Sequence, residues 1–152
     1  MADAYIVALT MLSRRELSEA QVRTRLARKE FEDEAIEAAI ERLRQDGTLT
    51  DRRVALAAAR LESTVRHRGR SRVLQKLRTL GIDAEVAESA VNEVFEEVDE
   101  GALLDRAFER RLRGQDPKDL DDKARARIVR GLAAQGFRFE AIMKRLKGNP
   151  DR

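Results

Sequence analysis

Arginine side chains gather in a few short stretches of the sequence, and guanidinium groups are the chemistry that these stretches offer. The densest stretch is 66–72, which reads Arg-His-Arg-Gly-Arg-Ser-Arg. A guanidinium binds phosphate or carboxylate oxygens through two parallel hydrogen bonds. These arginines are therefore candidates for contact with a nucleic acid or with an acidic protein surface. The candidate contacts are Arg23, Arg25, Arg28, Arg66, Arg68, Arg70, Arg72, Arg125, Arg127 and Arg130.

The net charge of +3 hides a sorting of charge along the chain. Residues 52–78 hold nine basic residues and one acidic residue, whereas residues 83–105 hold nine acidic residues and no basic one. Two explanations stay open: opposite blocks pair between neighbouring helices, or the basic helices line one side of the protein and face phosphates or an acidic groove. Arginine outnumbers lysine 25 to 6, which suits bidentate binding, although an arginine-favouring genome would give the same ratio.

Residues that could support catalysis or hold a metal are scarce. The chain has no cysteine and one histidine, which excludes zinc-thiolate sites, cysteine nucleophiles and a multi-histidine metal site. We expect His67 to be an exposed histidine between two helices. Acidic pairs such as Glu96–Glu97 occupy adjacent helical positions, which do not converge on one face. Neither a Ser-His-Asp arrangement nor a phosphate-binding glycine loop is present, so we expect no enzyme activity, no cofactor and no metal.

Apolar runs are short, and none approaches the roughly 20 residues that cross a bilayer. The first residues also lack the basic segment of a secretory signal. Five Phe and one Tyr are too few for a platform on which bases stack. We expect a soluble cytoplasmic protein that does not bind membranes, and a monomer.

Helices are the elements expected to position the arginines. Apolar residues recur at three- and four-residue spacings, as at Ile36, Ile40 and Leu43, which indicates one face of a helix. Ser18 and Gln21 have the spacing of a capping box. No segment alternates with period two, so we expect an all-α fold without a sheet. The expected helices are 4–12, 19–29, 33–45, 51–66, 71–80, 84–98, 101–113, 121–135 and 139–147, with Gly47, Gly81, Gly114 and Gly136 at helix ends.

One apolar spacing occurs three times and groups these helices in threes. Leu26 precedes Phe31 by five residues, and the same spacing joins 77 to 82 and 132 to 137. Five residues further on stand Ile36, Ala87 and Ile142, as expected when an apolar residue before a helix packs on the fourth helical position.

Coincidence in an ordinary helical bundle is the alternative, but three copies favour a true repeat. We expect an elongated tandem array of three three-helix repeats, because stacked repeats mainly contact their neighbours. The expected boundaries are 1–48, 49–99 and 100–147, with a C-terminal tail at 148–152.

Three stretches together resemble the RecX family. Residues 12–15 read Leu-Ser-Arg-Arg, residues 47–54 read Gly-Thr-Leu-Thr-Asp-Arg-Arg-Val, and the basic turn at 66–72 precedes Leu77 and Gly81-Ile82. The family has a similar opening, a Gly-x-Leu-Asp-Asp-x-Arg-Phe stretch and a basic glycine-rich turn. The resemblance covers roughly residues 4–147. The chain departs from the family pattern at Thr50, Val54, His67, Arg70 and Lys76.

The resemblance implies stacked three-helix units that bind the RecA protein and the RecA–DNA filament, usually inhibit the recombinase, and have no catalytic site. For Asp51 and Arg53, which match the family, we favour structural roles as a helix-start charge and an inter-helix ion pair. Two alternatives stay open. One is direct binding to single- or double-stranded DNA without sequence specificity, and the other is an unrelated helical adaptor whose charges pair internally.

Overall fold

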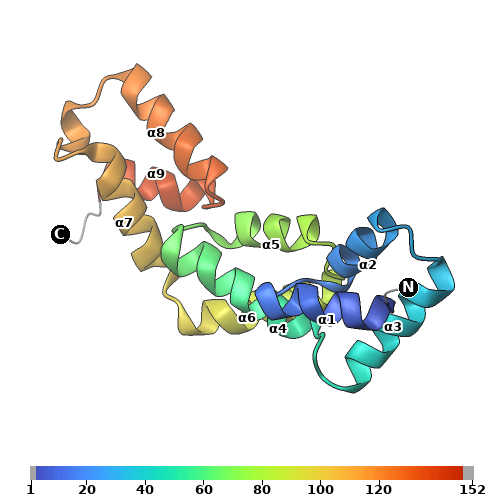
Figure 1. Cartoon of the computed structure of the whole chain (residues 1–152). Coiled ribbons are helices and arrows are strands. Elements are labelled where there is room, and N and C mark those ends of the chain that lie inside the picture. Colours follow the sequence, from blue (N-terminus) through green and yellow to red (C-terminus); the bar gives the residue numbers. More distant parts are fainter. Residues whose placement is uncertain (1–2, 149–152) are drawn as a thin grey trace. The chain divides into compact units, whose positions relative to one another are not determined.

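The computed structural model describes residues 3–148, and over that range the chain contains helices and no strand (Figure 1). This confirms the all-α prediction. The α-helices are α1 (Ala4–Arg14), α2 (Glu19–Arg28), α3 (Asp33–Gln45), α4 (Asp51–Arg60), α5 (Arg70–Thr79), α6 (Ala84–Glu97), α7 (Glu100–Leu112), α8 (Asp122–Ala134) and α9 (Phe139–Lys147). A π-helical segment, η1 (Leu61–Val65), extends α4, and a 3-10 turn, η2 (Pro117–Asp119), precedes α8. Of the expected tail at 148–152, residues 149–152 lie outside the described range.

The five-residue apolar spacing that occurs three times in the sequence corresponds to three helix ends of the same type. The N–H of Phe31 donates to the carbonyl of Leu26 over 3.3 Å, and the N–H of Glu30 donates to that of Ala27 over 2.9 Å. These two bonds define a Schellman motif, which places its second-last residue in the left-handed region. The same pair of bonds ends α5 at residues 77–82 and α8 at residues 132–137. Their left-handed residues are Glu30, Gly81 and Gly136, with φ values of 67°, 77° and 99°.

Each of these turns leads directly into the next helix. Phe31 stands one residue before the N-cap Glu32 of α3, and Ile36 is the fourth residue of that helix. Phe137 and Ile142 have the same relation to α9. The hydrophobic staple expected from the spacing is therefore present in register, and it fixes how each helix leaves its turn. The capping box at Ser18 and Gln21 is also confirmed.

The helices gather into two compact units. Unit 1 comprises the chain up to Ala58 together with Lys76–Ala90, and unit 2 comprises Ala59–Gln75 together with the chain from Val91 onward. In unit 1, α1, α2 and α3 pack on one another around buried side chains such as Leu26 and Ile40. In unit 2, α7, α8 and α9 pack around side chains such as Leu104 and Leu132. The three repeat boundaries and the elongated shape stay predictions.

One kind of joint occurs in both units. In unit 1 the start of α2 contacts the α5–α6 turn, where the Ser18 hydroxyl donates to the carbonyl of Leu80. In unit 2 the start of α5 contacts the α8–α9 turn, where the Ser71 hydroxyl donates to the carbonyl of Gly136 over 3.0 Å. A Cβ on Gly69 would come within 2.5 Å of that carbonyl oxygen. The second joint therefore depends on the absence of a side chain at Gly69.

Candidate functional site

The candidate arginines of α2 differ in how they are engaged within unit 1. The Arg23 guanidinium donates twice to the Glu37 carboxylate, with Nε–Oε1 at 2.6 Å and Nη2–Oε2 at 3.2 Å. This hydrogen bonding lowers the pKa of Glu37 and keeps it charged, so the charge of Arg23 is locally balanced. Within residues 3–148, Arg25 and Arg28 make no side-chain hydrogen bond or ion pair. They are the α2 arginines left available to a partner.

Two residues that match the family pattern have structural roles in unit 1. The Asp51 carboxylate begins α4 and accepts the N–H of Glu19 over 2.8 Å, while burial raises its pKa. The Arg53 guanidinium contacts the Glu16 carboxylate at 3.1 Å and donates to the carbonyl of Thr48 at 2.7 Å. The helix-start charge expected at Asp51 is present. Arg53 does form an ion pair, but the pair joins α4 to the loop between α1 and α2, and not to another helix as was expected.

Side chains of the basic turn at 66–72 are mostly held by residues of unit 2. Glu62, only 4% exposed, accepts a bond of 2.8 Å from Arg66. The Arg70 guanidinium donates to the Asn92 side chain, and Arg72 donates to Gln75 over 2.6 Å. Within the described range the buried Nε of Arg68 has no hydrogen-bond acceptor. Three of the four arginines of this turn are thus engaged by side chains of unit 2.

The α8 arginines also separate into structural and available side chains. Arg125 donates to the carbonyls of Leu120 and Pro117, at 3.3 and 3.2 Å, and thereby closes the loop that holds η2. Arg127 and Arg130 are exposed, and neither has a side-chain partner between residues 3 and 148. The ten predicted contacts therefore do not form one site. Arg68 and Arg72 line one cavity of unit 2, of about 450 Å³, and Arg66 and Arg127 line another.

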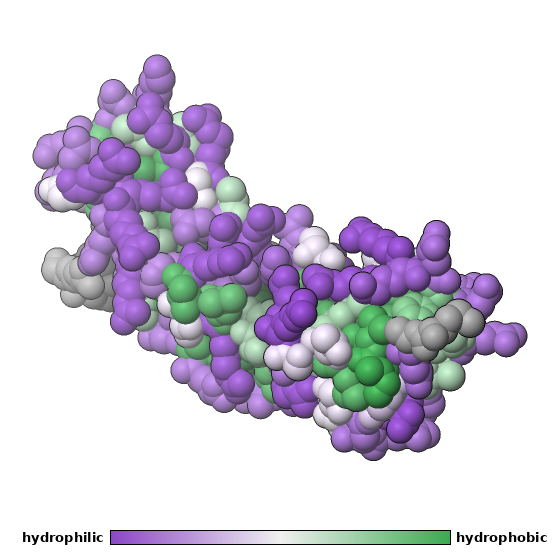
Figure 2. Space-filling view, viewed as in Figure 1, coloured by the Kyte–Doolittle hydropathy of each residue, from purple (hydrophilic) through white to green (hydrophobic). Residues whose placement is uncertain are grey.

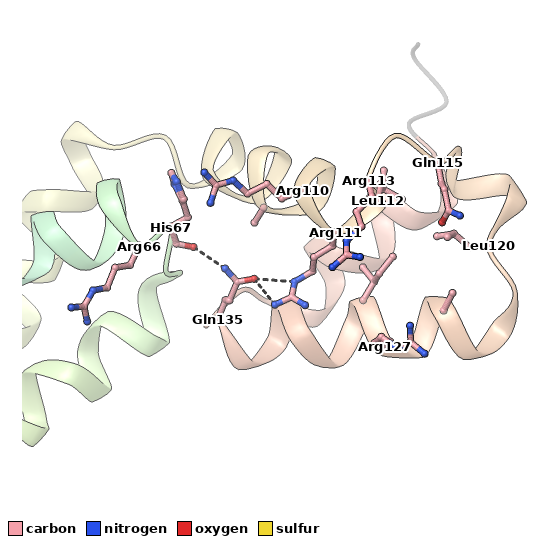
Figure 3. A pocket seen from close by; sticks show the side chains of 13 residues that line it. Arg66, His67, Arg110, Arg111, Leu112, Arg113, Gln115, Leu120, Arg127 and Gln135 are labelled. Atoms are coloured by element: carbon pink, nitrogen blue, oxygen red, sulfur yellow. Dashed lines mark hydrogen bonds between the residues drawn. The ribbon is translucent and has the colours of Figure 1, made fainter.

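This cavity, called the arginine cavity below, has a volume of about 540 Å³ and lies entirely within unit 2 (Figure 3). It lies between the 66–67 turn, the end of α7 and the face of α8. Leu112, Leu120 and Ile128 give it an apolar side. Its charged lining consists of Arg66, Arg110, Arg111, Arg113 and Arg127, with His67 beside them and no carboxylate.

An amide side chain fixes one of these guanidiniums. Arg111 donates from Nε and Nη2 to the Gln135 Oε1, at 3.1 and 3.0 Å. The Gln135 amide in turn donates to the carbonyl of His67 over a long 3.5 Å, as the dashed lines in Figure 3 show. In the same view Arg66 points away from Gln135, consistent with its bond to Glu62. The cavity thus holds an oriented guanidinium whose charge no carboxylate cancels.

Prediction from sequence missed most of this lining. Arg110, Arg111 and Arg113 were not among the candidates, although the run Arg-Arg-Leu-Arg is visible at 110–113. A further signal was Gly131, a glycine inside α8, because an isolated helical glycine often has a packing reason. A Cβ at Gly131 would collide with the Arg111 guanidinium. The expectation of an exposed His67 was wrong, since the residue is half-buried and its Nδ1 is enclosed.

Between residues 3 and 148 the structure offers neither a metal site nor a membrane-spanning helix. No three His, Cys, Asp or Glu side chains between residues 3 and 148 converge to hold a metal ion. None of the helices in that range combines the length and apolar character needed to cross a membrane. On the face shown in Figure 2, hydrophilic side chains cover most of the part formed by α7, α8 and α9. Charged and polar groups therefore dominate what unit 2 presents there.

These features define an all-helical protein built from three-helix groups, and known proteins resemble it in sequence and in fold. The family model for the first three-helix domain of RecX matches residues 4–43. A regulatory protein RecX of Syntrophotalea carbinolica is 38% identical over 136 residues, which cover 89% of this chain and 88% of the relative. One of Trichlorobacter lovleyi is 33% identical over 144 residues, covering 93% and 92%. The chain belongs to the RecX family of regulatory proteins.

Solved structures agree on the fold. The crystal structure of RecX from Lactobacillus salivarius matches with a TM-score of 0.81 at 20% identity, covering 95% of this chain and 94% of the other. A second crystal structure, of a regulatory protein RecX, matches with the same TM-score, and the match covers 95% of this chain and 70% of the other. The helical architecture is thus retained where four in five residues differ.

Proposed function

We propose that this chain binds the RecA recombinase and its filament on DNA, and that it lowers the recombinase and ATPase activities of that filament. The observation that carries the proposal is family membership over nearly the whole chain, since the relatives are named regulatory protein RecX. The exposed arginines that no residue between 3 and 148 engages, such as Arg28 and Arg130, support it. They can meet phosphates of the DNA or carboxylates of the recombinase.

The mechanism proposed is occupancy rather than chemistry. A helical body that binds one filament conformation more tightly than another shifts the filament toward that conformation. Inhibition follows if the bound conformation cannot admit a second DNA or turn over ATP. No group of the chain has to react with a substrate, so this regulator needs neither a cofactor nor a metal.

The test is to add the protein to RecA assembled on single-stranded DNA, and to follow ATP hydrolysis and strand exchange. We expect both rates to fall as the protein is titrated. The double variant R28Q/R130Q should require roughly tenfold more protein for the same effect, because it loses two exposed charges at proposed contacts. The matched control R106Q/R138Q removes two exposed arginines that are not among the ten candidate contacts, and it should act like the natural chain. No change in either rate at saturating protein would reject the proposal.

Direct DNA binding without RecA is the second candidate, and the available charges of Arg25, Arg28, Arg127 and Arg130 favour it. It predicts affinity for any DNA sequence that falls steeply with salt, because phosphate contacts release counterions. A titration in the absence of RecA separates the candidates. Weak and salt-insensitive binding eliminates the DNA binder, and a pulldown that fails to return RecA would favour the helical adaptor instead.

A further inference from the structure

The arginine cavity has both the size and the lining of a small-molecule site. Its volume of about 540 Å³ falls within the range of roughly 300–1,000 Å³ typical of ligand pockets. One side is apolar, with Leu112 and Ile128 buried and Leu120 half-buried. The other side presents arginines. A ligand that combines a flat, weakly polar part with several negative charges would satisfy both sides.

We propose that the arginine cavity binds a nucleotide, with its phosphates on Arg110, Arg111, Arg113 and Arg127 and its base against the apolar side. The nucleotide is either a free nucleoside polyphosphate or belongs to a few successive nucleotides of a nucleic-acid strand, since both offer a base together with several phosphate charges. This inference goes beyond the regulation of RecA, because every group that it uses belongs to unit 2 of this chain.

Charge and geometry favour phosphates over an isolated carboxylate. Carboxylates could cancel the cavity's charge, but none of its lining residues is acidic. Within residues 3–148, Arg110, Arg113 and Arg127 make no side-chain hydrogen bond or ion pair. Arg111 is held by the neutral Gln135 amide, which orients the guanidinium without reducing its charge. An oriented cation loses less freedom on binding an anion, so this arrangement is suited to a polyanion.

Backbone conformation provides a second, independent observation. Three residues other than glycine have positive φ in the described part of the chain, and two of them, His67 at 54° and Arg113 at 52°, line the cavity. Both residues stand at the end of a helical segment, where a left-handed residue is common but is usually glycine. An L-residue in this conformation is strained, and such strain concentrates at ligand-binding sites. Gly114, the next residue along, also has positive φ and has open space where a Cβ would stand. The turn therefore keeps an arginine at 113 where glycine would be less strained.

The test is calorimetric titration of the full chain, without RecA or magnesium, with pyrophosphate, ATP, a short poly(dT) oligonucleotide and a glutamate peptide. We expect ATP or the oligonucleotide to bind at least about tenfold more tightly than pyrophosphate, because the base adds apolar burial. Binding of ATP identifies a soluble nucleotide as the ligand, and binding of the oligonucleotide alone identifies a strand. Tightest binding of the glutamate peptide, or equal affinity for ATP and pyrophosphate, would overturn the nucleotide assignment.

Matched variants localise the binding. R110Q/R127Q should weaken nucleotide binding by at least about tenfold, since charge-assisted hydrogen bonds are lost. The control R106Q/K123Q removes the same charge from exposed positions of the same two helices, outside the cavity lining, and should change affinity less than about twofold. Equal losses in the two variants would show general attraction and overturn the site.

A third variant guards against loss of folding. R113G places glycine at a left-handed position, so its thermal stability should be unchanged or raised while nucleotide affinity falls. Unchanged affinity in this stable variant would also count against the proposal. Because RecA is absent from every measurement, failure here leaves the recombinase proposal standing, and the reverse also holds.

Discussion

Three turns of the chain place different residues in one backbone conformation. Glu30, Gly81 and Gly136 each occupy the left-handed position of a Schellman motif. Glycine adopts this conformation without a steric penalty, whereas an L-residue with a Cβ pays roughly 1–2 kcal/mol. The turn after α2 is therefore the strained member of the set.

Exchanging residues at this position should change stability in opposite directions. E30G should raise the free energy of unfolding by about 1 kcal/mol, because it relieves the positive φ of 67°. G81A should lower it by more than about 1 kcal/mol, since its Cβ would also collide with Ala20. Urea unfolding followed by circular dichroism measures both changes.

E30A is the control for this pair, because it removes the carboxylate but keeps the Cβ. Stabilisation by E30A as large as that by E30G would mean that charge, and not backbone strain, is responsible.

The positions of these turns could be predicted from the sequence, but the hydrogen bonds that form them were not recognised. The five-residue spacing of Leu26 and Phe31 was explained by the hydrophobic staple alone. It also reflects a backbone hydrogen bond, in which the N–H of Phe31 donates to the carbonyl of Leu26. The positive φ of Arg113 could not be predicted from the sequence. Glycine is the residue that usually adopts this conformation, and the glycine at 114 would have been expected to adopt it instead of Arg113. Prediction fails at such a residue because local preference is overridden.

Between elements, an ion pair with two hydrogen bonds joins α3 to the start of α2. The Arg44 Nη2 donates to the Glu19 Oε2 over 2.8 Å, and this hydrogen bonding lowers the pKa of Glu19 below its ordinary value of 4.5. A carboxyl group whose pKa is lowered by folding stabilises the folded state above its ordinary pKa. That contribution is lost as the pH falls through the lowered value.

E19Q should therefore destabilise the protein at neutral pH and cease to do so in acid. We expect a loss of about 0.5–1 kcal/mol, because the Arg44 side chain is 45% exposed and solvent screens the pair. The difference from the natural chain should shrink as the pH falls below 4.5, where the carboxyl group begins to be protonated in the unfolded state. Urea unfolding at a series of pH values checks this.

E34Q is the matched control for the ion pair. Glu34 lies in the first turn of α3, is exposed and makes no ion pair within residues 3–148. A loss in E34Q as large as in E19Q would assign the effect to the helix dipole instead of Arg44.

Most helices begin and end within two residues of their expected bounds, because caps, staples and glycines are local signals. The fourth is the exception, since α4 ends at Arg60 and continues as η1. The hydroxyls of Ser63 and Thr64 accompany the change by donating to carbonyls one turn earlier, at 2.7 and 2.6 Å. A π-turn inserts one residue into a helix, and the apolar period of so short a segment does not reveal it.

For the molecule as a whole, the net charge of +3 is a poor guide to where anions bind. The arginine cavity combines residues 66–67 with residues from the end of α7 and from α8 through Gln135, which begin about 40 residues later in the sequence. The distribution of charge along the sequence identified the basic helices. Which of their arginines come together depends on tertiary packing. Only Arg66 and Arg127 were therefore predicted among the residues of this site.

Salt dependence reports how many of these charges meet phosphates. For single strands the logarithm of affinity falls with the logarithm of salt concentration by about 0.7 per phosphate contact, so four cavity arginines correspond to a slope of roughly −3. R110Q/R127Q should reduce the slope to about half, because two of the four contacts are lost. Fluorescence titration of labelled poly(dT) over a range of KCl concentrations measures the slope. An unaltered slope would place the phosphate contacts outside the cavity.

The lining of the arginine cavity contains no lysine and the chain contains no cysteine, which has a practical consequence. Amine-directed dyes and acetylating agents modify the six lysines and leave the guanidiniums of the cavity unmodified. Dicarbonyl reagents such as phenylglyoxal have the opposite selectivity. Protection of Arg110 or Arg127 from phenylglyoxal, mapped by mass spectrometry, would therefore report occupancy of this surface in an otherwise unaltered protein.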